Sequence, residues 1–359
     1  MRSTARLMTP FLFLLLITLC CLALCISPAP EQEPAHGDQQ VTGGQGAEVT
    51  EPPSPSMTYN PSGPKPVRII FIHHSTGENW LNDDNGDLGK TLMQNNYYVS
   101  DTNYGWGPAY DPDNVPVGDM TDIGQWWVWF RSPQSPTIMN RVYGESVSHS
   151  SYTRFENPPG GENEIIMFKS CFPNSVLQGS LTDPVPSIDS NPLKGEGSGS
   201  EYHTVANAKG IYLDLLEYFK TKPDKLFIIV TAPPVSDGKY ASNARAFNEW
   251  LVNDYLKGYP GKNVVVYDFY NVMTSNGGSS SVNDAGKESG NHHRMQNGAV
   301  QHKVEAGIMG TKNTAAFASG WDDDHPTTAG SQKATAEFVP VLNHVYAQWK
   351  AGSPAQGSA

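Results

Sequence analysis

The sequence predicts an α/β fold, a doubly wound sheet of five parallel strands covered by helices on both faces in a three-layer sandwich. Two observations predict it. Short runs of β-branched and aromatic residues are almost continuously apolar, as expected for strands that are buried on both faces. Segments with apolar residues at helical spacing separate these runs, and such alternation is typical of a parallel sheet. Long loop insertions interrupt the pattern.

Five runs are expected to form the strands, and each is rich in Val, Ile, Leu, Phe or Tyr: residues 67–72, 97–99, 164–168, 226–230 and 264–267. Between and after them, apolar residues recur three or four positions apart, which predicts helices. These helices are expected at residues 88–95, 205–219, 244–256 and 327–349, the last of them kinked at Pro340. In such sheets, functional groups collect beyond the carboxyl ends of the strands.

Three connections, at residues 105–161, 178–200 and 271–320, are unusually long for a compact domain. The first contains a group of large aromatic side chains: Trp106, Trp126, Trp127, Trp129 and Phe130. These aromatic residues could line a substrate site, or they could pack as a small core beneath the loop. The first interpretation makes Trp106 and Trp127 candidate substrate-binding residues.

An export signal is expected at residues 1–29. Arg2 and Arg6 precede a run of roughly 16 apolar residues, which is shorter than the ~20 needed to span a bilayer as a helix. Cleavage would release the protein, whereas retention of this segment, or a lipid on Cys25 in the weak lipobox-like stretch 22–25, would anchor it to the cell envelope. We expect a secreted or extracellular protein whose membrane tether, if it has one, is the N-terminus.

Residues 30–65 are rich in Pro, Gly, Glu and Gln, and this composition predicts a disordered linker. A single domain at residues 66–350 and a flexible tail at 351–359 are expected to follow. Cys171 is the one cysteine beyond the signal, so the domain can form no internal disulfide. The net charge of −12 argues against nucleic acid as a partner. The many polar and aromatic residues favour a small-molecule or glycan partner instead.

Ser75 follows the first predicted strand, in the stretch His73-His74-Ser75-Thr76-Gly77. A serine on a tight turn at this place would project its hydroxyl beyond the sheet, and its own backbone N–H could bind an oxyanion. Gly77 would let the chain turn and let a substrate approach. The chain has no G-x-S-x-G motif, so the ordinary α/β-hydrolase arrangement is not expected.

His325 stands before the last predicted helix, in the stretch Trp321-Asp322-Asp323-Asp324-His325-Pro326. Pro326 fits the first turn of a helix, so His325 is expected at the exposed start of that helix. An acid three residues earlier, Asp322, could bind Nδ1 of the imidazole and leave Nε2 as a base. Which of Asp322 and Asp323 does so stays open, and Asp323 or Asp324 could instead cap the helix.

The order of these residues resembles the SGNH, or GDSL-type, hydrolases over about residues 66–350. The resemblance depends on a serine after the first strand, a glycine after the second, an asparagine after the third and a terminal D-x-x-H: Ser75, Gly105 or Gly107, Asn174, and Asp322 with His325. The chain departs from the family in two places. His73-His74 stands where the family has Gly-Asp, and the Cys171–Ser175 stretch lacks the glycine and the final aspartate of G-x-N-D.

The resemblance implies a serine esterase that forms an acyl-enzyme and needs no metal or other cofactor. Ser75 would be the nucleophile, His325 the general base and Asp322 its partner. The oxyanion would be held by the backbone N–H of Ser75, that of Gly105 or Gly107, and the amide of Asn174. His74 would help to position the substrate. We expect short acyl groups, such as acetyl, on a carbohydrate as the substrate.

Three alternatives remain open. The first is a lipid or aryl esterase of the same fold. The second is a metal-dependent hydrolase that uses histidines and acids from this set: His73, His74, His292, His293, residues 322–324 and His325. Adjacent histidines on a strand point to opposite faces, which disfavours a shared ion. The third is a carbohydrate-binding module without catalysis, which would have no need of Ser75, Asp322 and His325.

Overall fold

The computed structural model describes residues 61, 63–110, 113–274, 283–305 and 323–352. The expected export signal, most of the expected linker and the last seven residues of the expected tail lie outside the described residues. None of the described helices is both long enough and apolar enough to cross a membrane.

Five strands form a parallel sheet in the order β2-β1-β5-β6-β7. They are β1 (Val67–Ile72), β2 (Tyr97–Thr102), β5 (Ile165–Lys169), β6 (Leu226–Val230) and β7 (Val264–Tyr267). The prediction of an α/β fold with five parallel strands is confirmed. Strand β2 runs on to Thr102 rather than ending at Val99, because the buried Ser100 and Asp101 find hydrogen-bond partners in a neighbouring loop.

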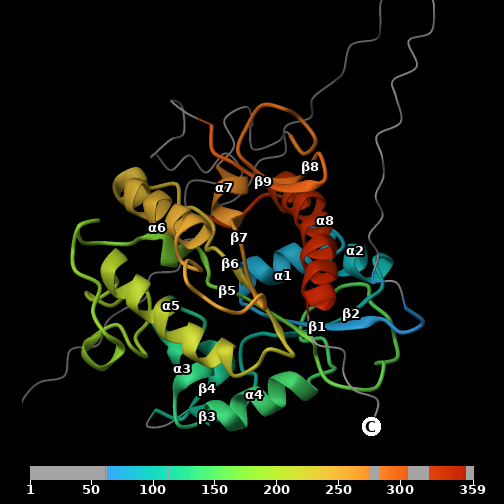
Figure 1. Cartoon of the computed structure of the whole chain (residues 1–359), viewed down its shortest axis with the longest axis horizontal. Coiled ribbons are helices and arrows are strands. Elements are labelled where there is room, and N and C mark those ends of the chain that lie inside the picture. Colours follow the sequence, from blue (N-terminus) through green and yellow to red (C-terminus); the bar gives the residue numbers. More distant parts are fainter. Residues whose placement is uncertain (1–60, 62, 111–112, 275–282, 306–322, 353–359) are drawn as a thin grey trace, which may run out of the picture. The chain divides into compact units, whose positions relative to one another are not determined.

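Alternate side chains of each strand enter two separate hydrophobic clusters. In β1, Ile70 and Ile72 pack in one cluster, whereas Ile69 and Phe71 pack in the other. Residues of α5 (Val205–Lys220) and α6 (Ala241–Asn253) complete the first cluster. Residues of α1 (Ser75–Leu81), α2 (Leu88–Gln94), α7 (Phe269–Met273) and α8 (Thr328–Gly352) complete the second. The sheet is therefore the middle of three layers (Figure 1).

The helix predictions hold with small shifts of their ends. The prediction at 88–95 corresponds to α2, that at 205–219 to α5 and that at 244–256 to α6. Helix α8 begins at Thr328 and includes Pro340 as one continuous element. The backbone N–H groups in the first turn of a helix have no acceptor within the helix. In α8, the Thr327 hydroxyl accepts a hydrogen bond of 3.3 Å from one of them, the N–H of Gly330. Thr327, rather than Asp323 or Asp324, therefore caps the start of α8.

The connection at 105–161 is folded rather than an open loop. Its described residues contain six short elements: β3 (Ala109–Tyr110), β4 (Val115–Pro116), two 3-10 helices (Val117–Asp119 and Ile123–Gln125), α3 (Trp126–Arg131) and α4 (Ser135–Gly144). Trp126 and Trp129 are fully buried, and Trp126 packs edge-on against Phe168 of β5 with ring centroids 4.8 Å apart. These tryptophans are part of the core beneath the connection, as the packing alternative predicted.

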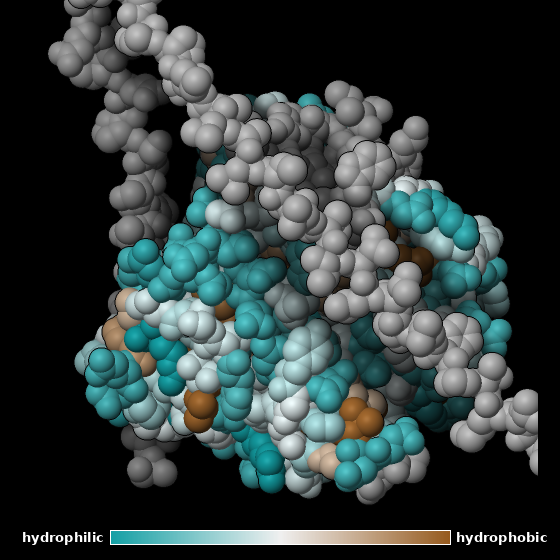
Figure 2. All heavy atoms as spheres, turned by 180° about the vertical axis from the view of Figure 1, so that it is seen from behind, coloured by the Kyte–Doolittle hydropathy of each residue, from teal (hydrophilic) through white to brown (hydrophobic). Residues whose placement is uncertain are grey.

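The connection after β7 also contains structure that the sequence analysis missed. Strands β8 (His292–Gln296) and β9 (Ala299–Lys303) form an antiparallel hairpin that packs against α8. Where Figure 2 shows coloured atoms, the surface is mainly hydrophilic, with hydrophobic side chains in small separate spots.

Candidate active site

Ser75 and His325 lie together beyond the carboxyl end of β1. The His325 Nε2 atom is 2.6 Å from the Ser75 Oγ atom, although 250 positions separate the two residues. The neighbours of β1 in the sheet are β2 and β5, so the chain leaves β1 at the point where the strand order reverses direction. Open α/β sheets bind ligands at such a point.

The local backbone brings Ser75 to this position in a different way from the tight turn we expected. Ser75 is the first residue of α1, and the carbonyl of His74 starts the helix by accepting hydrogen bonds from the N–H groups of Gly77 and Glu78. Gly77 is required because His73 packs on it. A Cβ atom at Gly77 would lie 2.4 Å from the His73 Cβ and Cγ atoms.

Asp323 is the acid that contacts His325 within the described residues. Its carboxylate bonds both the Nδ1 atom and the backbone N–H of His325. A carboxylate at Nδ1 fixes the proton on that nitrogen, so Nε2 is left to accept the Ser75 proton. Asp322, our expected partner, lies outside the described residues. Asp324 instead accepts a hydrogen bond of 2.6 Å from the Ser236 backbone N–H, which ties this segment to the loop after β6.

His73 lies beneath the site and does not face it. Its side chain is fully buried, with Nε2 3.2 Å from the Asp101 carboxylate and Nδ1 2.8 Å from the His74 carbonyl oxygen. Although burial raises the pKa of Asp101, hydrogen bonds from His73, Ser150 and the His149 backbone N–H outweigh burial and lower that pKa. His73 therefore forms part of the support of α1.

His74 and Tyr104 stack beside Ser75. Their ring centroids are 3.9 Å apart, and the His74 Nε2–H donates to the Gly118 carbonyl at 2.6 Å. Burial lowers the pKa of His74, which favours the neutral ring. One nitrogen and one ring face of His74 are thus engaged by Gly118 and Tyr104, and its role in positioning substrate stays a prediction.

Tyr104 is a site residue that the sequence analysis missed. It is 60% exposed, the most exposed large hydrophobic side chain among the described residues. Burial raises the pKa of its hydroxyl, whereas hydrogen bonding with the side chain and the backbone N–H of Ser75 acts in the opposite direction. The Tyr104 hydroxyl therefore lies close to the side chain and the backbone N–H of Ser75. An aromatic residue directly after Asn103, at a strand end, was the available signal.

Two of the expected oxyanion donors are already bound to other groups. The Gly105 N–H donates to the Asp119 carboxylate at 2.6 Å. The Asn174 amide nitrogen donates to Asp122 at 2.6 Å and to the Cys171 carbonyl at 3.3 Å, and the residue is buried. In this arrangement neither group faces an oxyanion. Gly107 adopts a left-handed conformation with φ of 86°, where glycine is favoured.

A buried cation and a thiol lie next to Ser75. The Cys171 Sγ atom is 3.6 Å from Ser75 Oγ and 3.4 Å from Thr76 Oγ1. Lys169, at the end of β5, is fully buried and donates to Thr76 Oγ1 and to the Ser170 carbonyl. Burial lowers the pKa of Lys169 to about 8. Burial raises the pKa of Cys171, but the charge of Lys169 and hydrogen bonds with Thr76 and Ser75 outweigh this effect and lower it.

The two tryptophans expected to bind substrate, Trp106 and Trp127, pack mainly against other side chains of the protein. Trp106 is buried, stacks on Trp129 with ring centroids 5.6 Å apart, and donates its indole N–H to Glu145 at 2.7 Å. Trp127 is half-buried at the edge of the core, and the ammonium of Lys194 lies over its ring at 5.3 Å.

The histidines of the expected metal alternative do not converge. His292 bonds Glu337, and His293 accepts a hydrogen bond from the Asp268 N–H, both in the β8 region. In the part of the chain that the structure describes, no group of three or more His, Cys, Asp or Glu side chains is arranged to hold a metal ion.

Comparison with known proteins identifies no relative: no family model, no curated protein and no solved structure matches the chain. The functional interpretation therefore depends on the geometry of the site.

Proposed function

We propose that this protein is an exported serine esterase of the SGNH type, acting on short acyl esters, such as acetyl esters, of carbohydrates. The observation that supports the proposal most strongly is the chain of contacts from Asp323 through His325 to Ser75. A nucleophile, a base and an acid that orients the base are the parts that acyl transfer through a serine requires.

In the proposed mechanism, His325 Nε2 takes the proton of Ser75 as the serine oxygen attacks the ester carbonyl. Asp323 holds the imidazole in place and stabilises its protonated form. His325 then gives the proton to the leaving alcohol. In the second half-reaction it activates a water that hydrolyses the acyl-enzyme, and Ser75 is regenerated.

The oxyanion needs hydrogen-bond donors near Ser75. The Ser75 backbone N–H remains our first candidate, and an oxyanion there would replace the Tyr104 hydroxyl as its partner. Gly107 remains a candidate from the sequence analysis. Because Gly105 and Asn174 are engaged elsewhere, we propose the hydroxyl of Tyr104 as a further donor. Tyrosine hydroxyls serve in oxyanion holes of other enzymes.

The proposal is tested with the purified protein, p-nitrophenyl acetate and a fluorophosphonate probe. We expect hydrolysis that EDTA does not inhibit, covalent labelling of Ser75, and loss of both in Ser75→Ala. Labelling of a different serine, or activity that needs a metal ion, would refute this mechanism. Acetate release from acetylated oligosaccharides should exceed fatty-acid release from lipid esters, and the reverse ranking would favour the lipid esterase alternative.

A further inference from the structure

A polar pocket adjoins the candidate active site through Tyr104. It holds about 540 Å³ of open space and is lined by Tyr104, Gly105, Trp106, Gly107, Arg141, Gly144, Glu145 and His149. This volume lies within the range of about 300–1,000 Å³ that is usual for small-molecule sites. Because the Tyr104 ring stacks on His74 and its hydroxyl lies beside Ser75, a ligand in this pocket would contact the same tyrosine as the reacting ester.

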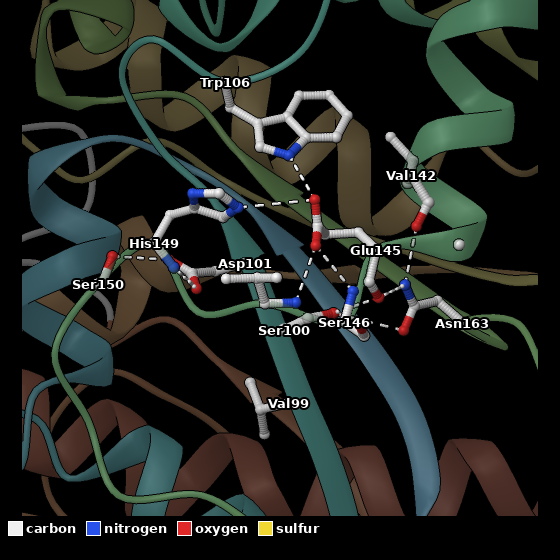
Figure 3. Close-up of polar contacts among 12 residues, drawn as sticks. Val99, Ser100, Asp101, Trp106, Val142, Glu145, Ser146, His149, Ser150 and Asn163 are labelled. Atoms are coloured by element: carbon white, nitrogen blue, oxygen red, sulfur yellow. Dashed lines mark hydrogen bonds and ion pairs between the residues drawn. The ribbon is translucent and has the colours of Figure 1, made fainter. Parts of the chain in front are cut away.

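The Glu145 carboxylate in this pocket is already saturated with donors. One oxygen accepts hydrogen bonds of 2.8 Å from the backbone N–H groups of Ser146 and Val147. The other accepts from the Trp106 indole at 2.7 Å and lies 3.6 Å from His149 Nε2. Figure 3 shows the indole and the imidazole both directed at this carboxylate. Glu145 thus organises the pocket and has little capacity left to bind a ligand.

Arg141 is the free charged group of the pocket. It is exposed in the last turn of α4, and no acid pairs with it among the described residues. Arg131, at the end of the preceding helix, differs in that it makes an ion pair of 2.9 Å with Asp214. A guanidinium binds a carboxylate through two parallel hydrogen bonds, so a free arginine beside a pocket favours a carboxylate-bearing ligand.

The pocket also has room beside its glycines. A Cβ atom at Gly144, or at Gly105, would have no heavy atom within 4 Å. Gly144 follows Arg141 by one helical turn, so the open space lies on the same side of the helix end as the guanidinium. A bulky side chain at Gly144 would enter this space without removing any contact that the pocket makes.

We propose that this pocket binds a carboxylate-bearing sugar unit of the substrate, and that Arg141 holds the carboxylate. The inference rests on the proposed esterase function and specifies it: the substrate would be an acetylated acidic glycan, such as an oligomer of a uronic acid, rather than a neutral one. Arg141 is here a specificity-determining residue, and Tyr104 connects its pocket to the reacting ester.

The experiment measures acetate release from acetylated oligogalacturonate and from acetylated xylo-oligosaccharides, with p-nitrophenyl acetate as the small reference substrate. Wild type should prefer the acidic oligomer. Because Arg141 is exposed and water screens its charge, Arg141→Gln should lower kcat/KM for the acidic oligomer by about 3- to 10-fold. Its effect on the neutral oligomer should be much smaller. Gly144→Phe should fill the pocket and so lower kcat/KM for both oligomers. Thermal melting curves check that each variant is folded.

The matched control is Lys257→Gln, which also removes one exposed positive charge but lies in the loop before β7, at the opposite edge of the sheet. It should keep the preference of wild type. If p-nitrophenyl acetate is hydrolysed but wild type does not prefer the acidic oligomer, or Arg141→Gln keeps that preference, the pocket assignment is wrong and the esterase stands. If no ester is hydrolysed, the proposed function itself has failed.

Discussion

Replacing Asp323 by Asn tests how the base of the site is oriented. The Asp323 carboxylate bonds both the Nδ1 atom and the backbone N–H of His325. The substitution keeps the size of the side chain but removes the charge that would stabilise a protonated imidazole. It also allows the amide nitrogen to face Nδ1, which would place the ring proton on Nε2, the wrong nitrogen for a base.

The exposure of Asp323 sets the size of the expected effect. A buried aspartate in a catalytic triad is worth about 10⁴ in kcat. The Asp323 side chain is 55% exposed, so water screens its charge and can partly replace it. A hydrogen bond to a charged group contributes about 1.5–3 kcal/mol, which corresponds to a decrease in kcat of about 10- to 100-fold. We expect the lower half of that range, with KM little changed.

The assay is hydrolysis of p-nitrophenyl acetate at saturating substrate, with Asp322→Asn and Asp324→Asn measured in parallel. Asp324 bonds the Ser236 N–H rather than the imidazole, so its variant should lose less activity than Asp323→Asn. A large loss in Asp322→Asn together with an unaffected Asp323→Asn would show that our assignment of the imidazole partner is wrong.

Two further substitutions test groups near Ser75. Tyr104→Phe keeps the ring that stacks on His74 but removes the hydroxyl, and kcat should fall by about 10²-fold at nearly constant KM; an unchanged kcat would exclude the hydroxyl as an oxyanion donor. Lys169 has a pKa of about 8 in the folded protein and 10.5 as its ordinary value. Between these values the unfolded chain binds more protons, so this lysine makes stability rise with pH. We expect the contribution of Lys169 to raise the free energy of unfolding of wild type by about 3 kcal/mol between pH 7.5 and 10.5, and Lys169→Met should lack this contribution. Urea unfolding across this pH range measures both proteins, and the same pH dependence in the two would contradict the prediction.

The strands and the meeting of Ser75 with His325 could be predicted because both depend on strong, regular signals. Continuous apolar runs defined the sheet, and the carboxyl ends of parallel strands lie at one edge of it. Ser75 follows the first strand and His325 precedes the last helix, so the topology brings both residues to the same edge of the sheet.

The oxyanion donors could not be predicted with the same success, because their competing acceptors come from a segment with weak signals. Asp119 binds Gly105 and Asp122 binds Asn174, and both acids lie in the connection at 105–161. Its helix α3 is only six residues long and consists largely of aromatic residues. Its sequence therefore does not show the three- or four-residue spacing of apolar side chains that predicts a helix. Spacing along the chain located the donors but could not show that they were already occupied.

The contact between α1 and α8 has a consequence for how the proposed activity arises. The indole of Trp80 donates to the Thr335 hydroxyl at 2.9 Å, and that hydroxyl donates to the Gly86 carbonyl at 2.6 Å. Helix α1, which begins with Ser75, is thus held against helix α8, which follows His325. A polypeptide that has not yet docked α8 would not bring Asp323 and His325 to Ser75, so the proposed esterase activity would require this docking.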